Sequence, residues 1–510
     1  MRVAIIAPQL DADEVRPEWT DAQAAAYQNV ILAQAATMLK ANGHNVSWLL
    51  WESSSAGEAG LVRRLAGEQF KLVVILAITS KIYGAWSLID KMKQFSVKAR
   101  PKIALVGAHA SALPEESFNN CGADYVLLGG DFDFLLTSLC ARLHDVDRRS
   151  ATRLEPGILS KQRGEIKTSG QWRPEHNLTL PPFIDRELTG LFPGLANNAP
   201  TRLNRCAAIY TSRDCWWARC RNCARKVLSP PGSYRVRSPE AVLNEIGLLM
   251  AKHGVTRIVD TSGSLPTGLW LRRLCQGLIK RGYNRKVRLT CSLKPGSIGR
   301  SEATLMVEAG FDTAKVALHS VNQVTLEKLG SNMIASDIED SLKMWRAAGL
   351  RLLVSAELGW PWESSDEAVQ TCDWLQRLAG DRLTFSSSIV HAIAFPGTPL
   401  LEAANRQGWV QATSWKDFSG NDPVFKSALT TEQLAAISGN IHRSEHARWF
   451  PALAYEAIRV RSGQWLWRLR KYRYWRRRPT HGPINLTARA DSPLGQPDDT
   501  AAGNQRADRP

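Results

Sequence analysis

Short, almost continuously apolar runs alternate with helical stretches along the first 145 residues, and this alternation restricts the fold more than any other feature. The first run starts at Val3 and the last ends at Gly130. The helical stretch after the first run ends at Gly43, as a helix with a glycine C-cap would. Apolar strands separated by helices are typical of a parallel sheet covered on both faces. We therefore predict a doubly wound α/β domain over residues 1–145.

Ligands of such sheets bind in the loops beyond the carboxyl ends of the strands. In this chain those loops are residues 79–81, 107–111 and 129–131. The alternation then breaks, because residues 146–200 are polar and contain six prolines. We predict that this segment is a linker that packs on its neighbours.

The alternation of strands and helices resumes over residues 201–415. Ser238 and Pro239 are typical of a helix start, and Gly254 of its end. Six successive strand and helix units predict a barrel or partial barrel with its active site at the carboxyl ends of the strands. Beyond it we expect a small, α-rich, basic region over residues 416–478 and a disordered tail over residues 479–510.

Composition excludes several classes of protein. The chain has 510 residues, of which 44% are hydrophobic and 22% charged, so it is neither wholly disordered, collagenous nor a coiled coil. No run of about 18 apolar residues is present, and the first residues do not match a signal peptide. We therefore expect a cytoplasmic protein.

Cysteine spacing predicts a metal centre. Nine cysteines are too few and too irregular for a disulfide scaffold, yet Cys206, Cys215, Cys220 and Cys223 fall within eighteen positions. The last three form a C-x4-C-x2-C pattern directly after the first strand of the second domain, where thiolates could bind zinc or an iron–sulfur cluster. Cys206 lies at the opposite end of that strand. Three ligands without a fourth favour a cubane cluster with one open iron.

The loop TSRDCWWARCRNC resembles that of the radical SAM superfamily, specifically its cobalamin-binding branch, which usually has C-x3-C-x2-C in a segment such as TSRGC. Here one extra residue separates the first two cysteines, and Asn222 stands where the family usually has an aromatic residue. The resemblance extends over residues 1–415, through the segments LVGAHASALPEE, ADYVLLGGDFD, ELGWPWESSDEAVQT and AFPGTPLLEAANRQGWV.

This resemblance implies a Rossmann-like cobalamin-binding domain followed by a (βα)6 partial TIM barrel. It also implies that Cys215, Cys220 and Cys223 hold a 4Fe-4S cluster. The open iron would bind S-adenosyl-L-methionine (SAM), and an electron from a donor such as flavodoxin or ferredoxin would cleave SAM to methionine and a 5′-deoxyadenosyl radical. The protein holds these cofactors in register and excludes water.

By position, the resemblance places the SAM site at the ends of the barrel strands. The residues carried over are Thr261, Ser262, Gly263, Ser292, Lys294, Ser320 and Glu357. Each of them could equally be a polar residue that satisfies backbone groups at a strand end. His319 stands where relatives often have a glutamate, and is either a proton carrier or a structural histidine.

The first domain lacks the D-x-H-x-x-G signature, in which a histidine binds cobalt. His109 follows the fourth strand and is not that ligand by position. Relatives without the signature bind the corrin with no protein ligand to cobalt. The resemblance then implies that glycines and small residues let the backbone approach the corrin, namely Gly107, Ala108, Ser111, Gly129 and Gly130. The alternative is a domain retained only for packing.

Residues 456–478 hold nine Lys or Arg against one Glu, which is nearly half of the net charge of +17. Aromatic residues such as Trp465 and Trp467 are interleaved with the arginines. The segment could form an interfacial helix on an anionic membrane, an arm that contacts RNA or substrate, or a helix that covers the barrel. A peripheral membrane contact is therefore possible, and nucleic acid is not the favoured partner.

The leading hypothesis is a cobalamin-dependent radical SAM methyltransferase acting on an unactivated carbon or a phosphinate centre of a small molecule or peptide. A non-methylating radical reaction, such as cyclisation or ring contraction, is the alternative within this class. A zinc-stabilised protein that binds nucleic acid or membrane is the alternative outside it. Tryptophans near the predicted site suit a flat or apolar substrate, although packing also explains Trp216, Trp217, Trp360 and Trp362.

Overall fold

A computed structural model describes most of the first 433 residues. The described residues are 1–8, 20–51, 55–97, 99–145, 153–189, 206–229, 232–331, 333–380, 386–420, 422–430 and 433. Residues 1–456 form one compact unit, and the predicted basic region beyond 433 and the tail lie outside the described residues. Among the described residues, no helix is both long and apolar enough to cross a membrane.

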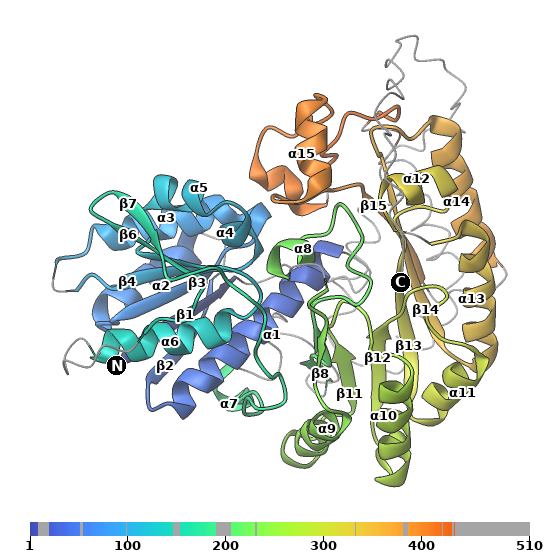
Figure 1. The fold of residues 1–510 in the computed structure, drawn as a ribbon, viewed down its shortest axis with the longest axis horizontal. Helices are drawn as coiled ribbons and strands as arrows, with labels where there is room; N and C mark the ends of the chain where they lie inside the picture. The colour runs from blue at the N-terminus through green and yellow to red at the C-terminus, as the bar shows by residue number, and fades with distance from the viewer. Residues whose placement is uncertain are drawn as a thin grey trace, which may run out of the picture. The chain divides into compact units, whose positions relative to one another are not determined.

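The first domain is built on five parallel strands with helices between them (Figure 1). Its strands are β1 (Arg2–Pro8), β2 (Asn45–Trp51), β3 (Leu72–Leu76), β4 (Lys102–Val106) and β5 (Tyr125–Leu127). Its helices are α1 (Thr20–Ala41), α2 (Ser55–Gly67), α3 (Ile82–Lys93), α4 (Ala108–Ala112), α5 (Pro114–Cys121) and α6 (Phe132–Asp145), with the short 3-10 helix η1 (Thr79–Lys81) after β3.

Helices cover both faces of this sheet, as predicted. The strand order β2-β1-β3-β4-β5 reverses direction between β1 and β3, which is the doubly wound arrangement. Helices α1 and α6 pack against one face, and α2, α3 and α5 pack against the other. Because both faces are covered, every residue of β3 is buried, which explains its continuous run of apolar residues.

The segment predicted to be a linker contains two strands that the sequence pattern did not indicate. Strands β6 (Ile158–Gln162) and β7 (Glu165–Thr168) extend the first sheet beyond β5 as an antiparallel hairpin. All four residues of β7 are exposed, so this edge strand carries no apolar pattern that could reveal it. The following helix α7 (Arg186–Thr189) includes the buried Arg186, which donates to the backbone oxygen of Ala208 at 2.8 Å.

The second sheet has six parallel strands whose spatial order follows the chain, as predicted for repeated strand and helix units. The strands are β8 (Cys206–Ile209), β11 (Arg257–Asp260), β12 (Arg288–Ser292), β13 (Phe311–Ala317), β14 (Arg351–Leu358) and β15 (Ser386–His391). The helices and short 3-10 turns between and after them are α8 (Arg225–Leu228), α9 (Pro239–His253), α10 (Leu269–Lys280), η4 (Tyr283–Arg285), α11 (Arg300–Glu308), α12 (Gln323–Lys328), α13 (Ala335–Ala348), α14 (Ser365–Gly380), α15 (Pro399–Arg406) and η5 (Trp415–Ser419).

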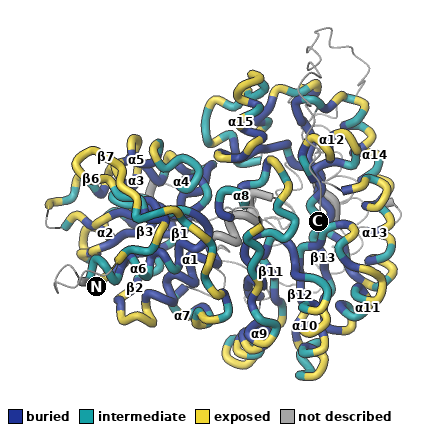
Figure 2. Tube along the Cα trace, viewed as in Figure 1, coloured by how far each residue is buried: buried dark blue, intermediate teal, exposed yellow. Residues whose placement is uncertain are grey.

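The start and end of α9 follow the sequence signals. The Ser238 hydroxyl accepts from the Ala241 backbone N–H, and Pro239 occupies the first turn. Gly254 ends the helix in the left-handed conformation. Helices α9, α10, α11 and α13 contact one another in chain order outside the strands. A buried apolar core lies between them and the sheet (Figure 2). Trp345 and Leu352 in this core are fully buried.

The chain after the second sheet returns to the first domain. The indole N–H of Trp415, in η5, donates to Glu116 Oε1 at 2.8 Å, and the Trp415 backbone N–H donates to the Tyr83 hydroxyl at 3.3 Å. The ring of Trp415 also stands edge-on to that of His109, with centroids 5.4 Å apart. Residues far apart in the sequence therefore close over the β3 and β4 ends of the first sheet.

Candidate functional site

The cysteine loop follows the first strand of the second sheet. Strand β8 leads into the two-residue strand β9 (Ser212–Arg213), the three cysteines follow at once, and α8 closes the loop. Two non-glycine residues of this loop have a positive φ, which is 70° for Asp214 and 44° for Ala218. Cys206 begins β8 and is buried, so it lies at the opposite end of that strand, as predicted.

His319 links Cys220 to Glu357. Its Nε2 atom lies 3.3 Å from the Cys220 sulfur, and its Nδ1 atom lies 3.1 Å from Glu357 Oε2. Burial alone would lower the pKa of His319, but the Glu357 carboxylate and the Cys220 thiolate raise it to about 10. Burial alone would raise the pKa of Cys220, but His319 lowers it to about 7. This arrangement favours a thiolate at Cys220.

Two residues that depart from the family pattern meet at Glu357. Asn222 is buried, and its side-chain amide donates to Glu357 Oε2 at 3.4 Å and to the Ile393 backbone oxygen at 3.3 Å. His319 approaches the same carboxylate oxygen. Asn222 and His319 therefore hold Glu357 from two sides, which gives both departures a common structural role.

The other two cysteines belong to the same electrostatic group. Burial raises the pKa of Cys223 to about 11, and the neighbouring Cys220 and Cys215 thiolates add to this. Burial would lower the pKa of Lys294, but the three thiolates raise it. The Cys215 sulfur also lies 3.7 Å from the Ser264 hydroxyl. Three interacting thiols with Lys294 and His319 beside them form a donor set that suits an anionic iron–sulfur cluster. Among the described residues, no three His, Cys, Asp or Glu side chains meet closely enough to hold a single metal ion.

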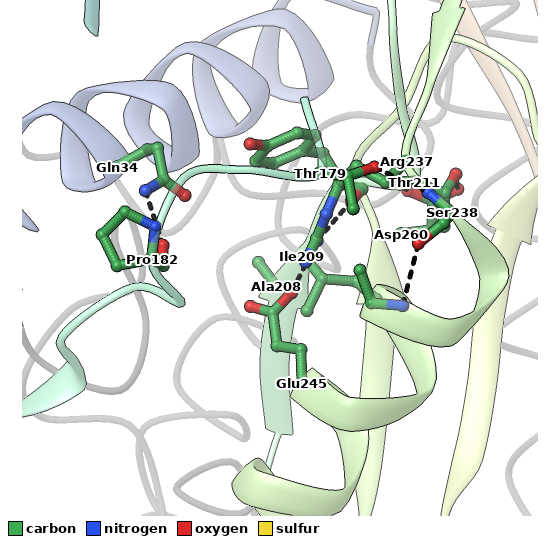
Figure 3. A network of polar contacts seen from close by, with 12 residues as sticks. Gln34, Thr179, Pro182, Ala208, Ile209, Thr211, Arg237, Ser238, Glu245 and Asp260 are labelled. Carbon is green, nitrogen blue, oxygen red and sulfur yellow. Dashed lines mark hydrogen bonds and ion pairs between the residues drawn. The ribbon is translucent and has the colours of Figure 1, made fainter. Parts of the chain in front are cut away.

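Asp260 organises the backbone that enters the cysteine loop. Its Oδ1 atom accepts from the backbone N–H groups of Thr211 and Ser262, both at 3.1 Å, and from the Ser262 hydroxyl at 2.7 Å. Its Oδ2 atom accepts from the Thr211 hydroxyl at 2.8 Å (Figure 3). The Ser262 hydroxyl in turn accepts from the backbone N–H groups of Thr211 and Ser212. The ends of β8 and β11 are thus tied together next to the cysteines.

This network predicts different effects for two substitutions of Asp260. Asp260→Ala removes the acceptor of four buried hydrogen bonds and should cost about 3 kcal/mol of stability. Asp260→Asn keeps the Oδ1 acceptor and should cost less than about 1 kcal/mol, because burial raises the pKa of Asp260 and so disfavours its charge. Thermal unfolding, monitored by circular dichroism, measures the stability loss of each variant. Equal losses in the two variants would show that the charge, and not the acceptor geometry, is what matters.

The predicted SAM-binding residues all lie at or just beyond the carboxyl ends of parallel strands, on the same edge as the cysteines. The Thr261 hydroxyl donates to the Ile209 backbone oxygen at 2.9 Å, and Ser320 is buried with its hydroxyl accepting from the Asn322 backbone N–H. Gly263 lies against the side chain of Arg225. Ser292 ends β12 and is only partly buried. The side chains of Thr261, Ser262 and Ser320 thus form hydrogen bonds with backbone groups of the protein. Their role in SAM binding stays a prediction.

The tryptophans near this edge differ in exposure. Trp360 is fully buried, and its indole N–H donates to the His319 backbone oxygen at 3.1 Å. It stacks on Trp362, with ring centroids 5.7 Å apart. Trp216 and Trp217 form an edge-to-face pair within the cysteine loop. Trp360 therefore belongs to the packed layer that supports His319.

The glycines predicted to approach a corrin pack against their own chain. A side-chain carbon at Gly129 would lie 2.4 Å from the Trp172 ring, and one at Gly130 would lie 2.9 Å from the Leu228 backbone oxygen. The Ser111 hydroxyl accepts from the Gly129 backbone N–H at 3.0 Å. Gly107 caps α4 with a φ of 107°. Contacts within the chain thus account for Gly129 and Gly130, and the corrin contact stays a prediction for these two residues and for Gly107, Ala108 and Ser111.

His109 is buried next to this edge. Its Nδ1 atom lies 3.4 Å from the Thr79 hydroxyl, and its Nε2 atom lies 3.7 Å from Glu116 Oε2. Burial lowers the pKa of His109 to about 4, so the ring is neutral. The aromatic rings of Trp86 and Trp415 enclose it. His109 is therefore part of the packing between η5 and the first sheet.

A buried group of charges that the sequence did not single out joins the two sheets. Asp131 and Asp133 follow β5 in the first domain, and both accept from the Arg213 guanidinium, at 3.0 Å and 2.8 Å respectively. Arg235 also binds Asp131, and His176 approaches it at 2.8 Å. Asp131, Asp133 and Arg213 lie in GGDFD and TSRDC, segments that carry the family resemblance, whereas Arg235 and His176 lie in neither segment.

Sequential strand and helix units, three thiols on the first loop and polar residues at the facing strand ends define a radical SAM domain. Residues 209–375 match the family model of the Radical SAM superfamily, so this part of the chain is a radical SAM domain. Such a domain implies a 4Fe-4S cluster and SAM as cofactors.

Three known proteins resemble the chain over most of its length. The uncharacterized methyltransferase PH0819 of Pyrococcus horikoshii is 24% identical over 387 residues, which are 74% of this chain and 79% of that protein. The radical SAM methyltransferase TsrM from Kitasatospora setae, with tryptophan substrate and a SAM analogue bound, matches with a TM-score of 0.64 at 17% identity, covering 86% of this chain and 88% of that chain. OxsB, a cobalamin-dependent SAM radical enzyme with aqua-cobalamin bound, matches with a TM-score of 0.61 at 13% identity, covering 93% and 71%. The two structural matches establish a shared fold.

Proposed function

We propose that this chain is a cobalamin-dependent radical SAM methyltransferase that methylates an unactivated carbon or a phosphinate centre of a small molecule. The observation that carries the proposal is the contact between the two candidate cofactor edges. Asp131 follows the last parallel strand of the first sheet, and it binds Arg213, two residues before the first cysteine of the loop. The edge expected to bind a corrinoid therefore adjoins the edge expected to bind the cluster.

The comparisons support this proposal in two ways. The matched structures of TsrM and OxsB span both sheets of this chain, and TsrM has also been described with cobalamin and a 4Fe-4S cluster bound. The Pyrococcus horikoshii relative is named a methyltransferase and aligns over three quarters of the chain.

Each cofactor has candidate residues. Cys215, Cys220 and Cys223 would hold the cluster. Strand-end residues would contact SAM, with backbone groups of Thr261, Ser262 and Gly263 joined by Ser292, Ser320 and Glu357. Gly107 and Ser111, with the backbone of residues 129–130, would face the corrinoid. When bound, the cluster and SAM supply a radical that removes a hydrogen atom from the substrate, and cobalamin supplies the methyl group.

The chain's own residues prepare this site. His319 and Lys294 place positive charge beside the thiolates, which favours their deprotonated form. Glu357 orients His319 from the opposite side. The buried indole of Trp360 backs the same histidine and keeps water from it.

Anaerobic reconstitution tests the proposal. The purified protein is given iron, sulfide and hydroxocobalamin, then SAM carrying a trideuterated methyl group, a strong reductant and a metabolite extract from a bacterial culture. We expect 5′-deoxyadenosine, S-adenosylhomocysteine and a product that carries the labelled methyl group. The matched control is Cys206→Ala, which lies at the other end of β8.

The outcomes separate the competing functions. Formation of 5′-deoxyadenosine without a labelled product would favour a non-methylating radical reaction. A protein that takes up zinc, binds no iron and never cleaves SAM would exclude the enzyme altogether. A protein that forms the cluster and binds no cobalamin would overturn the methyl-transfer step.

A further inference from the structure

The cysteine loop is closed at its base by a single carboxylate. Asp214 directly precedes Cys215, and Ser229 lies six residues beyond Cys223. The Ser229 hydroxyl donates a hydrogen bond to Asp214 Oδ1. Asp214 is 3% exposed in its side chain, so this contact is shielded from water. One acidic side chain thus joins the entry of the loop to its exit.

Asp214 occupies a backbone conformation that favours glycine. Its φ is 70°, in the left-handed region, where an aspartate is tolerated at some cost in backbone strain. The similar family segment TSRGC has glycine at this position, which would adopt the conformation without strain. The aspartate therefore adds a carboxylate at the expense of strain, which points to a use for that carboxylate.

The same carboxylate reaches the first domain through Arg235. Strand β10 (Arg235–Val236) pairs antiparallel with β9, so Arg235 and Arg213 stand opposite each other. The Nε atom of Arg235 binds Asp214 Oδ2 at 3.0 Å, and its two terminal nitrogens bind both oxygens of Asp131, at 2.6 Å and 3.0 Å. Arg235 is thus shared between the acid before Cys215 and an acid of the first domain.

A backbone contact next to Asp131 holds the other end of the loop. The Gly130 backbone N–H donates to the Leu228 backbone oxygen at 2.7 Å. Leu228 is the last residue of α8, just after the cysteines. Because a side-chain carbon at residue 130 would lie 2.9 Å from the same oxygen, only glycine permits this approach. Gly130 and Asp131 therefore contact both sides of the cysteine loop.

We propose that Gly130, Asp131, Arg235 and Asp214 form a strap that positions the cysteine loop against the first domain, with Asp214 and Asp131 as its positioning residues. The strap holds the start and the end of the cysteine loop at a fixed separation. This loop has one residue more between its first two cysteines than the family usually has. The strap also sets the place of the cluster relative to the carboxyl edge of the first sheet. This inference rests on the proposed function, because cluster retention is one of its readouts.

Four variants test the strap. Asp214→Gly relieves the strain and removes the carboxylate, whereas Asp214→Asn keeps an acceptor oxygen. Gly130→Ala drives a methyl group against the Leu228 oxygen. Gly60→Ala is the matched control, because that glycine lies in α2 with nothing within 4 Å of the added carbon. The measurements are the rate of iron release from the reconstituted protein to a ferrous chelator, and the hydrogen exchange of residues 127–133 in the metal-free protein.

For Asp214→Gly and Gly130→Ala we expect iron to be released about tenfold faster or more. Losses of this size are typical when a residue that supports a metal ligand, without binding the metal itself, is replaced. Hydrogen exchange at residues 127–133 should rise in the same two variants, while exchange in β12 and β13 stays at the wild-type level and excludes general unfolding. Asp214→Asn should fall between Asp214→Gly and wild type, and Gly60→Ala should match wild type.

The strap is overturned if Asp214→Gly and Gly130→Ala retain iron and exchange hydrogen as the wild type does. It is also overturned if exchange rises equally in β12 and β13, because the residues would then only stabilise the fold. A wild-type protein that takes up no iron contradicts the proposed function instead. The exchange comparison on metal-free protein decides the strap in that case too.

Discussion

Single substitution of Cys215, Cys220 or Cys223 by alanine should abolish both cluster binding and SAM cleavage. Removing one of three thiolates leaves a cubane with two protein ligands. Even the loss of a residue that only hydrogen-bonds to a metal ligand typically lowers metal affinity by about 10-fold to 100-fold. Iron and sulfide per chain should therefore fall by about tenfold or more. Chemical analysis of iron and sulfide measures the first effect, and chromatography of 5′-deoxyadenosine measures the second.

Cys206→Ala is the control for these three variants. Cys206 is buried in the same strand that leads to the loop, but it stands at the amino end of that strand, and burial raises the pKa of its thiol. It should keep the wild-type iron content and the wild-type yield of 5′-deoxyadenosine. Iron loss in Cys206→Ala equal to that in the three loop variants would contradict the assignment of ligands.

The local parts of this architecture were predictable from the sequence. Strands such as β3 are buried on both faces, so each appears in the sequence as a continuous apolar run. The three cysteines lie within nine residues of one another, so their spacing alone predicts a shared centre. Hairpin β6–β7 was missed because an edge strand with four exposed residues needs no apolar pattern.

The parts that depend on distant residues were not predictable. Arg213 and Asp131 are 82 positions apart, and Arg235 and Asp131 are 104 positions apart. Charged residues usually lie on solvated surfaces, so nothing in either segment marks these as buried partners. The same holds for Glu357, which is held by Asn222 from the cysteine loop and by His319 just beyond β13. Only the fold brings these side chains together.

Replacing Arg213 should have the largest effect on stability of any substitution considered. The side chains of Arg213, Asp131 and Asp133 are all 0% exposed. Asp131 keeps Arg235 and His176, but Arg213→Met leaves the buried Asp133 carboxylate without its cation. Breaking a buried pair in this way costs about 3–5 kcal/mol. Because each kcal/mol moves the midpoint of a large domain by about 2–4 °C, the thermal midpoint should fall by about 10 °C.

The pH dependence of this loss follows from the carboxylates. Burial raises the pKa of Asp133 even beside Arg213, and the variant removes the guanidinium that opposes this rise. A carboxyl whose pKa is higher in the folded protein than in the unfolded chain destabilises the fold at higher pH, and this penalty disappears as the pH falls through the folded-state pKa. The deficit of Arg213→Met relative to wild type should therefore shrink as the pH falls through the folded-state pKa of Asp133 in the variant.

Two further variants decide whether the buried charge is the cause. Adding Asp133→Asn to Arg213→Met removes the unpaired carboxylate, so the double variant should be more stable than the sum of the two single losses. Arg257→Met is the matched control, because Arg257 pairs with Asp312 at a partly exposed position of the six-stranded sheet and should cost less than about 1 kcal/mol. Additive losses in the double variant would mean that Arg213 acts through its packing on Phe134 and Tyr210 and not through its charge.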